Sequence, residues 1–165
     1  MKKIYILVIA CVLVISTVLA PAAYTFAQNY VTHKCEKEIS MHISANIILG
    51  INPEVKRGDK IIRVMGENLN RLDQILSYAK IKTKTLPEDC TEDKERIIIE
   101  FKAGLKLTVI DYYSGASDGK DIAYMIYENG TKTYYFKYEA LGVYNWVADV
   151  TDADGFYVPN KVLDL

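Results

Sequence analysis

The sequence is poor in the residues from which metal and catalytic sites are most often built. Its 165 residues contain only two histidines, His33 and His42, and three cysteines, and neither type is clustered. A zinc site needs three or four clustered protein ligands, and no two cysteines have the C-x-x-C spacing. Neither histidine has a catalytic partner visible in the sequence. We therefore predict no metal, no cofactor and no enzymatic activity.

An excess of positive charge is missing as well. Lysine and arginine together number 20 and the acidic residues 21, so the formal net charge is -1. Surfaces that bind nucleic acid or anionic lipid need clustered positive charge. This balance argues against a nucleic-acid partner. The sequence also lacks internal repeats and low-complexity segments, and its length suits one folded domain.

Charged residues are sparsest near the N-terminus. Lys2–Lys3 precede the apolar run Ile4–Ala20, and the next residue charged at neutral pH is Lys34. A positive lead, an apolar run and small residues form the layout of an export signal or an N-terminal anchor. We therefore predict a signal peptide or membrane anchor over residues 1–27 and a single extracytoplasmic domain over residues 28–165.

Three fates are open for this N-terminal segment. Small residues up to Ala27 would permit a cleavage that leaves Gln28 as the new N-terminus. An uncleaved segment needs roughly 20 apolar residues to span a bilayer, and the uncharged run is long enough to supply them. Val8–Cys11 resembles a bacterial lipobox, so lipidation of Cys11 is the third alternative. Cleavage would give a secreted protein, and retention would give one anchored in the cell membrane.

Cys35 and Cys90 remain if the segment is removed, which is an even count for an oxidising compartment. A disulfide between them would stabilise the fold by about 4 kcal/mol in the chain-entropy model. Spacing alone does not establish a bond, so two free buried thiols are the alternative. We predict the disulfide.

The remaining sequence indicates an α+β domain. Ile39–Ile47 alternates apolar and polar residues, which predicts a half-buried strand, and Lys60–Met65 is a second candidate. An apolar stripe at helical spacing follows Asn68, which predicts a helix that Asn68 caps, with Lys80 favourable at its negative C-terminal end. The stripe consists of Leu69, Leu72, Ile75, Leu76 and Ala79. With two hairpins and a last strand at 143–148, we expect an antiparallel meander of four or five strands. One main helix packs on a face, and a hydrophobic helix precedes the domain.

The register of the first hairpin follows from its apolar pattern. A three-residue loop, Lys102–Gly104, sets Phe101 opposite Leu105 and Glu100 opposite Lys106. Gly104 would take the left-handed position that such a loop needs.

Asn129-Gly130 predicts a two-residue type I′ turn in the second hairpin. This register places Tyr124 opposite Tyr135 and Met125 opposite Tyr134.

Tyrosines are concentrated in this β-rich part of the chain. Strand alternation must point some of these tyrosines away from the face that the helix covers, and the register puts Tyr124 and Tyr135 together on one side. Exposed aromatic residues on a sheet are typical of protein or glycan contact surfaces. The plain alternative is that tyrosine is a good strand residue. We predict Tyr124 and Tyr135 as binding residues for an extracytoplasmic protein or glycan.

Gly115–Gly119 matches the G-x-S-x-G pattern of serine hydrolases, with Ser117 at its centre. That motif works at a strand-to-helix turn with a histidine later in the chain. Here a strand is expected next and both histidines come earlier, so a loop is the simpler interpretation. A small secreted hydrolase that uses Ser117 remains an alternative function.

The plan of the chain resembles the small exported proteins of unknown function that are common in Gram-positive bacteria. The likeness is carried by the Met1–Lys3 lead, the apolar segment, and Asn68–Lys80 followed by the strands Ile97–Phe101 and Tyr134–Tyr138. It implies export and one small domain, and it transfers no catalytic residue. We expect a non-catalytic binding or interaction module. A structural membrane-tethered protein is a further alternative.

Overall fold

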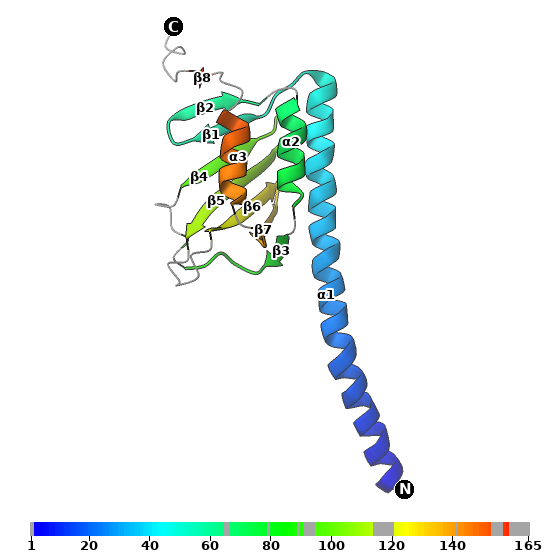
Figure 1. Ribbon diagram of the computed structural model, residues 1–165. Helices are drawn as coiled ribbons and strands as arrows, with labels where there is room; N and C mark the ends of the chain where they lie inside the picture. Colours follow the sequence, from blue (N-terminus) through cyan, green and yellow to red (C-terminus); the bar gives the residue numbers. More distant parts are fainter. Residues whose placement is uncertain are drawn as a thin grey trace.

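The computed structural model describes most of the chain. The described residues are 2–64, 67–78, 80–88, 90, 95–113, 121–140, 142–152 and 157–158, and the side chains of 2–16, 18, 19, 113, 121, 157 and 158 are not included. Within these ranges the chain forms three helices and one antiparallel sheet, so the fold is α+β, as predicted. The helices lie side by side on one face of the sheet, and the N-terminal part of the first helix extends away from it (Figure 1).

The sheet has eight strands in the described part of the chain, where four or five were predicted. Its order is β3-β7-β6-β5-β4-β1-β2-β8, and every neighbouring pair is antiparallel. The predicted meander is present as β4-β5-β6-β7. The strands are β1 (Glu54–Arg57), β2 (Lys60–Arg63), β3 (Lys80–Thr83), β4 (Arg96–Glu100), β5 (Leu105–Tyr113), β6 (Asp121–Asn129), β7 (Lys132–Tyr138) and β8 (Tyr157–Val158).

Helix α1 spans Lys2–Leu49, so the prediction of a strand at Ile39–Ile47 was wrong. Cys35, Ile39 and Ile43 recur every four residues and are buried, as expected for one face of a helix. Met41, which strand alternation would have placed beside them, is 61% exposed. Apolar residues at every second position contain the i, i+4 pairs of a helix, so the alternation was ambiguous.

The predicted N-terminal helix is present, and it continues without a break past Pro21 and Ala27 into the domain. Among the residues that the structure describes, no helix is both long enough and apolar enough to cross a membrane. The side chains of 2–16, 18 and 19 lie outside that description. The apolar segment Ile4–Ala20 and the lipidation of Cys11 therefore stay predictions.

The main helix predicted near Asn68 is α2 (Glu67–Leu76). It buries Leu69, Leu72 and Leu76 against the core, which matches the predicted apolar stripe. Because the helix begins at Glu67, Asn68 lies within its first turn and is not the N-cap.

Residues 143–148 were predicted as a strand but belong to α3 (Val143–Asp152). Val143, Val147 and Val150 are buried at helical spacing, so the segment covers the sheet instead of extending it.

The first hairpin, between β4 and β5, has the predicted register. Glu100 pairs with Lys106, and the backbone N–H of Phe101 donates to the Leu105 carbonyl at 2.9 Å. Gly104 closes the loop with a φ of 92°.

The second hairpin, between β6 and β7, is shifted from the predicted register by two residues. Asn129 pairs with Lys132, which leaves Gly130 and Thr131 as the turn. Gly130 alone has a positive φ, 60°, and glycine at the first central position suits a type II′ turn. A shift of two residues keeps every side chain on its predicted face.

The predicted disulfide is not present: Cys35 and Cys90 are both buried, and they are not bonded to each other. Cys35 belongs to the main core, which the three helices cover. Cys90 packs with Ile110 and Tyr124, which alternate with core-facing residues and so lie on the opposite face of the sheet. The sheet therefore separates the two thiols, which sequence spacing could not reveal.

Candidate functional site

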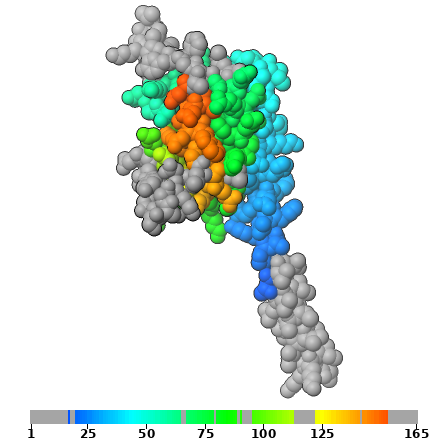
Figure 2. Space-filling model, in the orientation of Figure 1, coloured from blue at the N-terminus to red at the C-terminus, as the bar shows by residue number. Residues whose placement is uncertain are grey.

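Helix α1 is the candidate functional element, because it has two different environments along its length. In its N-terminal part the described side chains stand clear of the domain (Figure 2). Tyr24, Phe26 and Tyr30 are 56%, 74% and 63% exposed. Val31 is the first described α1 side chain that packs against the core, and Cys35 follows it as a fully buried one. The N-terminal part of this one helix therefore projects from the domain, and its C-terminal part packs against the core.

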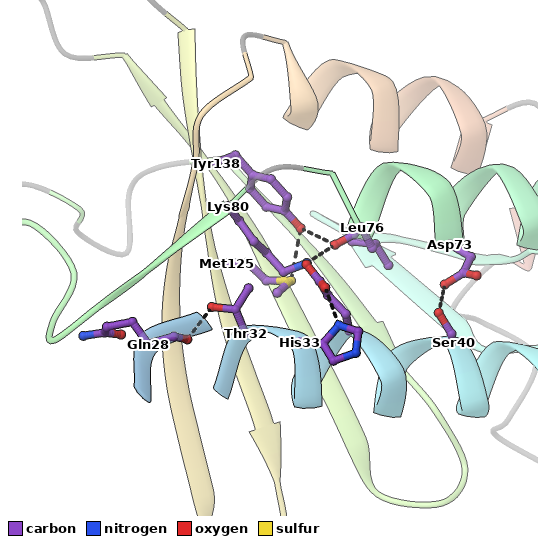
Figure 3. A network of polar contacts seen from close by, with 10 residues as sticks. Gln28, Thr32, His33, Ser40, Asp73, Leu76, Lys80, Met125 and Tyr138 are labelled. Carbon is purple, nitrogen blue, oxygen red and sulfur yellow. Dashed lines mark hydrogen bonds and ion pairs between the residues drawn. The ribbon is translucent and has the colours of Figure 1, made fainter. Parts of the chain in front are cut away.

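A buried lysine fixes α1 to the domain. The Lys80 side chain is fully buried, and its ammonium lies 3.2 Å from a carboxylate oxygen of Glu36 on α1. The same ammonium donates a hydrogen bond of 2.6 Å to the carbonyl of Leu76, the last residue of α2. Tyr138 Oη also donates to that carbonyl, at 3.3 Å (Figure 3). We call Lys80, Glu36, Leu76 and Tyr138 the α1 clamp.

Three further hydrogen bonds hold α1. Ser40 Oγ donates to an oxygen of Asp73 on α2 at 2.8 Å. The Tyr127 hydroxyl on β6 donates to Glu38 of α1, and the Asn129 amide donates to the same carboxylate at 3.2 Å. The Tyr127 bond holds the pKa of the Glu38 carboxyl below its ordinary value. These contacts tie α1 to both the sheet and the helical layer.

The electrostatics of the clamp follow from burial. Desolvation lowers the pKa of the Lys80 ammonium, and the charge of Glu36 opposes that shift. Burial also raises the pKa of the neighbouring Cys35 thiol to about 11. A reactive thiol needs a lowered pKa, so this shift does not favour a nucleophilic role for Cys35. The clamp thus pairs a buried ammonium with a carboxylate of α1 at the point where α1 contacts the domain.

The raised pKa of Cys35 predicts a loss of stability at alkaline pH. The unfolded thiol ionises near its ordinary value of 9.0, whereas the folded thiol keeps its proton up to about 11. The folded state thus binds more protons in this window, and stability falls as the pH rises through it. We expect Cys35 to account for a loss of about 2–3 kcal/mol between these values. The measurement is urea unfolding of the full chain at a series of pH values.

The Cys35→Ser and Cys35→Ala variants separate this effect from packing. Both remove the thiol, so both should show a flatter dependence of the unfolding free energy on pH than the native chain. Their stabilities at pH 7 will differ from each other, since one introduces a buried hydroxyl and the other a small cavity. An unchanged slope in both variants would contradict the prediction.

Tyr124 and Tyr135 share one face of the sheet, as predicted, and this face is opposite the helices. Their registers place Tyr124 beside Lys137 and Tyr135 beside Ile126, so the two tyrosines are diagonal neighbours. Tyr124 is only 8% exposed, because it packs in the cluster of Cys90. A binding role for this pair remains a prediction.

Ser117 and its glycine-rich motif lie outside the described residues. Within the described ranges, no group of histidine, cysteine and acidic residues could hold a metal ion.

A charged cavity of about 460 Å³ opens where β1 and β4 meet α3. Arg57 in its wall contacts Asp152 at 3.0 Å and Glu95 at 4.0 Å. Tyr144 Oη donates to the same Glu95 carboxylate at 3.2 Å, and burial raises the pKa of this hydroxyl to about 12. Lys56 is paired with Glu100 at 2.7 Å. Arg57 and Lys56 therefore already hold acidic partners in the wall of this cavity, which Arg96 also lines.

Sequence reasoning had placed Lys80 at the C-terminal end of α2 but gave it no partner on α1. It could not find Glu36, which is far away in the sequence, and it missed the groove between α2 and α3. No family model, curated protein or solved structure matches this chain. Its own residues must therefore carry the functional argument.

Proposed function

We propose that this chain is a non-catalytic extracytoplasmic binding module that α1 holds at the membrane. The observation that carries the proposal is the continuity of α1, a single helix of 48 residues. Its C-terminal part is clamped to the sheet through Lys80 and Glu36, and its N-terminal part extends away from the domain (Figure 1). A rigid connection of this kind would hold the domain close to the surface of the bilayer.

The length of the projecting part suits a bilayer. At a rise of about 1.5 Å per residue, residues 2–30 of α1 extend about 44 Å. A bilayer with its headgroup layers is about 40–45 Å thick. The sequence has no residue charged at neutral pH between Lys3 and Lys34. The projecting length and the uncharged length therefore agree.

The residues at each end of this segment support one orientation. Lys2 and Lys3 favour the cytoplasmic side under the positive-inside rule. Tyr24 and Tyr30 are exposed just before the domain, at the level where aromatic side chains gather in the headgroup layer. The domain then lies on the outer side. A helical backbone at Ala27 also supports retention over cleavage, because proteases favour exposed flexible chain.

The test introduces charge into the apolar run by replacing both Ile9 and Ile15 with arginine. Each charge near the centre of a membrane helix costs about 2.5–3.5 kcal/mol on insertion scales. The native chain should stay in the membrane pellet after an alkaline carbonate wash, and the double variant should move largely to the soluble fraction. Intact mass of the native chain should show residues 1–27 still attached.

Ile48→Arg is the matched control. Ile48 is 81% exposed at the far end of α1, so the same substitution there should leave the chain in the pellet. A native chain that begins at Gln28, or one that begins at a lipid-modified Cys11, would overturn the retained anchor. Equal retention of the Ile9→Arg/Ile15→Arg variant would overturn it as well.

A further inference from the structure

Helices α2 and α3 lie side by side on the outer surface of the domain (Figure 1). The groove between them has a volume of about 200 Å³. It is lined by Arg71, Gln74 and Ile75 from α2 and by Trp146, Asp149 and Val150 from α3. The volume is below the range of about 300–1,000 Å³ that is typical of sites for drug-sized ligands. The groove therefore suits a single ring and not an extended molecule.

An aromatic pair stands at this groove. Trp146 is the only tryptophan of the chain, and it is 40% exposed. Tyr78, 48% exposed, meets it edge to face with 5.8 Å between the ring centroids. A Cβ atom on Gly142 would lie 3.6 Å from the indole nitrogen, so the ring rests close to the backbone at that position. Trp146 thus gives the groove an exposed aromatic surface, and Tyr78 packs against that ring.

The polar side chains of the groove are available to a ligand. Arg71, Gln74 and Asp149 are exposed, and within the described part of the chain none of them has a hydrogen-bond or ion-pair partner. Together they offer donors, acceptors and a balanced charge. Arg57 in the charged cavity differs in this respect, because it is already paired with Asp152.

We propose that the α2–α3 groove binds one pyranose ring of a saccharide. Each sugar hydroxyl both donates and accepts hydrogen bonds, which matches a set that contains a guanidinium, an amide and a carboxylate. The C–H face of the ring packs against the aromatic surface of Trp146. One positive and one negative side chain give no preference for a charged ligand.

A saccharide fits this surface better than a protein partner does. A stable protein interface buries about 800 Å² on each side, whereas the exposed aromatic surface here is two rings beside a small groove. The inference names the ligand class for the binding module and rests on that proposed function. The site itself lies in the domain, so purified chain reports on it whether or not the anchor is retained.

The test is a titration of the full chain with cellotetraose and, separately, with chitotetraose, followed by tryptophan emission. The chain is kept in a zwitterionic detergent, because maltoside headgroups are themselves saccharides. A ring that covers Trp146 removes water from the indole, so we expect a saturable blue shift. A response to both sugars assigns the contact to the shared ring, and a response to chitotetraose alone adds recognition of the acetamido group. Either result supports the site.

The Asp149→Asn variant keeps the fluorophore and weakens the charge-assisted bond, so the affinity should fall about tenfold. Trp146→Leu, followed by calorimetry, should lose at least as much. Asp59→Asn, in the exposed turn between β1 and β2, is the matched control and should bind like the native chain. The proposal is overturned by the absence of a saturable response to either sugar, or by an unchanged affinity in Asp149→Asn. Protein ligands that occupy the groove while sugars do not would overturn it too.

Discussion

Replacing Ile39 or Ile43 with alanine is expected to lower the free energy of unfolding by about 2–5 kcal/mol each, through lost burial and the cavity left behind. The exposed fraction is 0% for Ile39 and 1% for Ile43. Met41→Ala and Ile47→Ala should change it by about 0.5 kcal/mol or less, because those side chains are 61% and 44% exposed. The measurement is urea unfolding of the full chain at fixed detergent concentration, followed by the emission of Trp146.

These four substitutions compare the two periodicities of one segment. In a strand all four side chains would share a face, so all four variants would be destabilised alike. In the helix only Ile39 and Ile43 face the sheet. Equal losses at Met41 and Ile39 would therefore contradict the assignment of this segment to α1. Met41→Ala and Ile47→Ala serve as matched controls because they remove apolar atoms from the same helix.

The elements that could be predicted were those specified by neighbouring residues. The hairpin of Phe101 and Leu105 was correct because loop length and apolar alternation allow only one register with a continuous core face. The turn predicted at Asn129-Gly130 lies one residue further along the chain, which shifts the pairing by two residues, because Asn-Gly is compatible with more than one two-residue turn. Local chemistry thus determined the faces of that hairpin but not its exact pairing.

The elements that could not be predicted depend on distant partners. Residues 143–148 have strand-forming side chains, yet they fold as α3 because their valines at helical spacing complete the cover over the sheet. Lys80–Thr83 was assigned to no strand, since a strand of four residues with two lysines is defined by its pairing with β7. Cys35 and Cys90 were paired wrongly for the same reason, because spacing does not reveal which face of a sheet a residue joins.

The α1 clamp could not be predicted from neighbouring residues either, although one of its contacts was expected. Lys80 was expected to interact with the C-terminal end of α2, and it donates to the Leu76 carbonyl there. Its full burial and its ion pair with Glu36 depend on α1 passing over the start of β3. Since α1 was divided into a leader and a strand, no partner for Lys80 could be named.

Substitution of the two charged residues of the clamp, Glu36 and Lys80, is expected to lower the free energy of unfolding by unequal amounts. Glu36→Gln leaves the Lys80 ammonium buried without its counter-charge, and we expect this to lower the free energy of unfolding by about 3 kcal/mol. Lys80→Met removes the buried charge and keeps the apolar stem beside Phe136 and Tyr138, so it should cost about 1 kcal/mol or less. Urea unfolding of the full chain measures both, with Tyr138 still able to donate to Leu76 in either variant.

The double variant Glu36→Gln/Lys80→Met tests the physical cause. If the cost of Glu36→Gln is that of an unpaired buried ammonium, adding Lys80→Met restores most of the lost stability, which gives a coupling free energy of about 2 kcal/mol or more. Burial already lowers the pKa of Lys80, and loss of Glu36 removes a charge that opposes this shift. The folded Glu36→Gln variant therefore binds fewer protons than the unfolded chain as the pH rises toward about 10.4, the ordinary value for lysine. Its stability deficit should shrink over that range, because a neutral amine needs no counter-charge. Additive losses, or a deficit that stays constant as the pH rises, would show instead that Glu36 acts through packing alone.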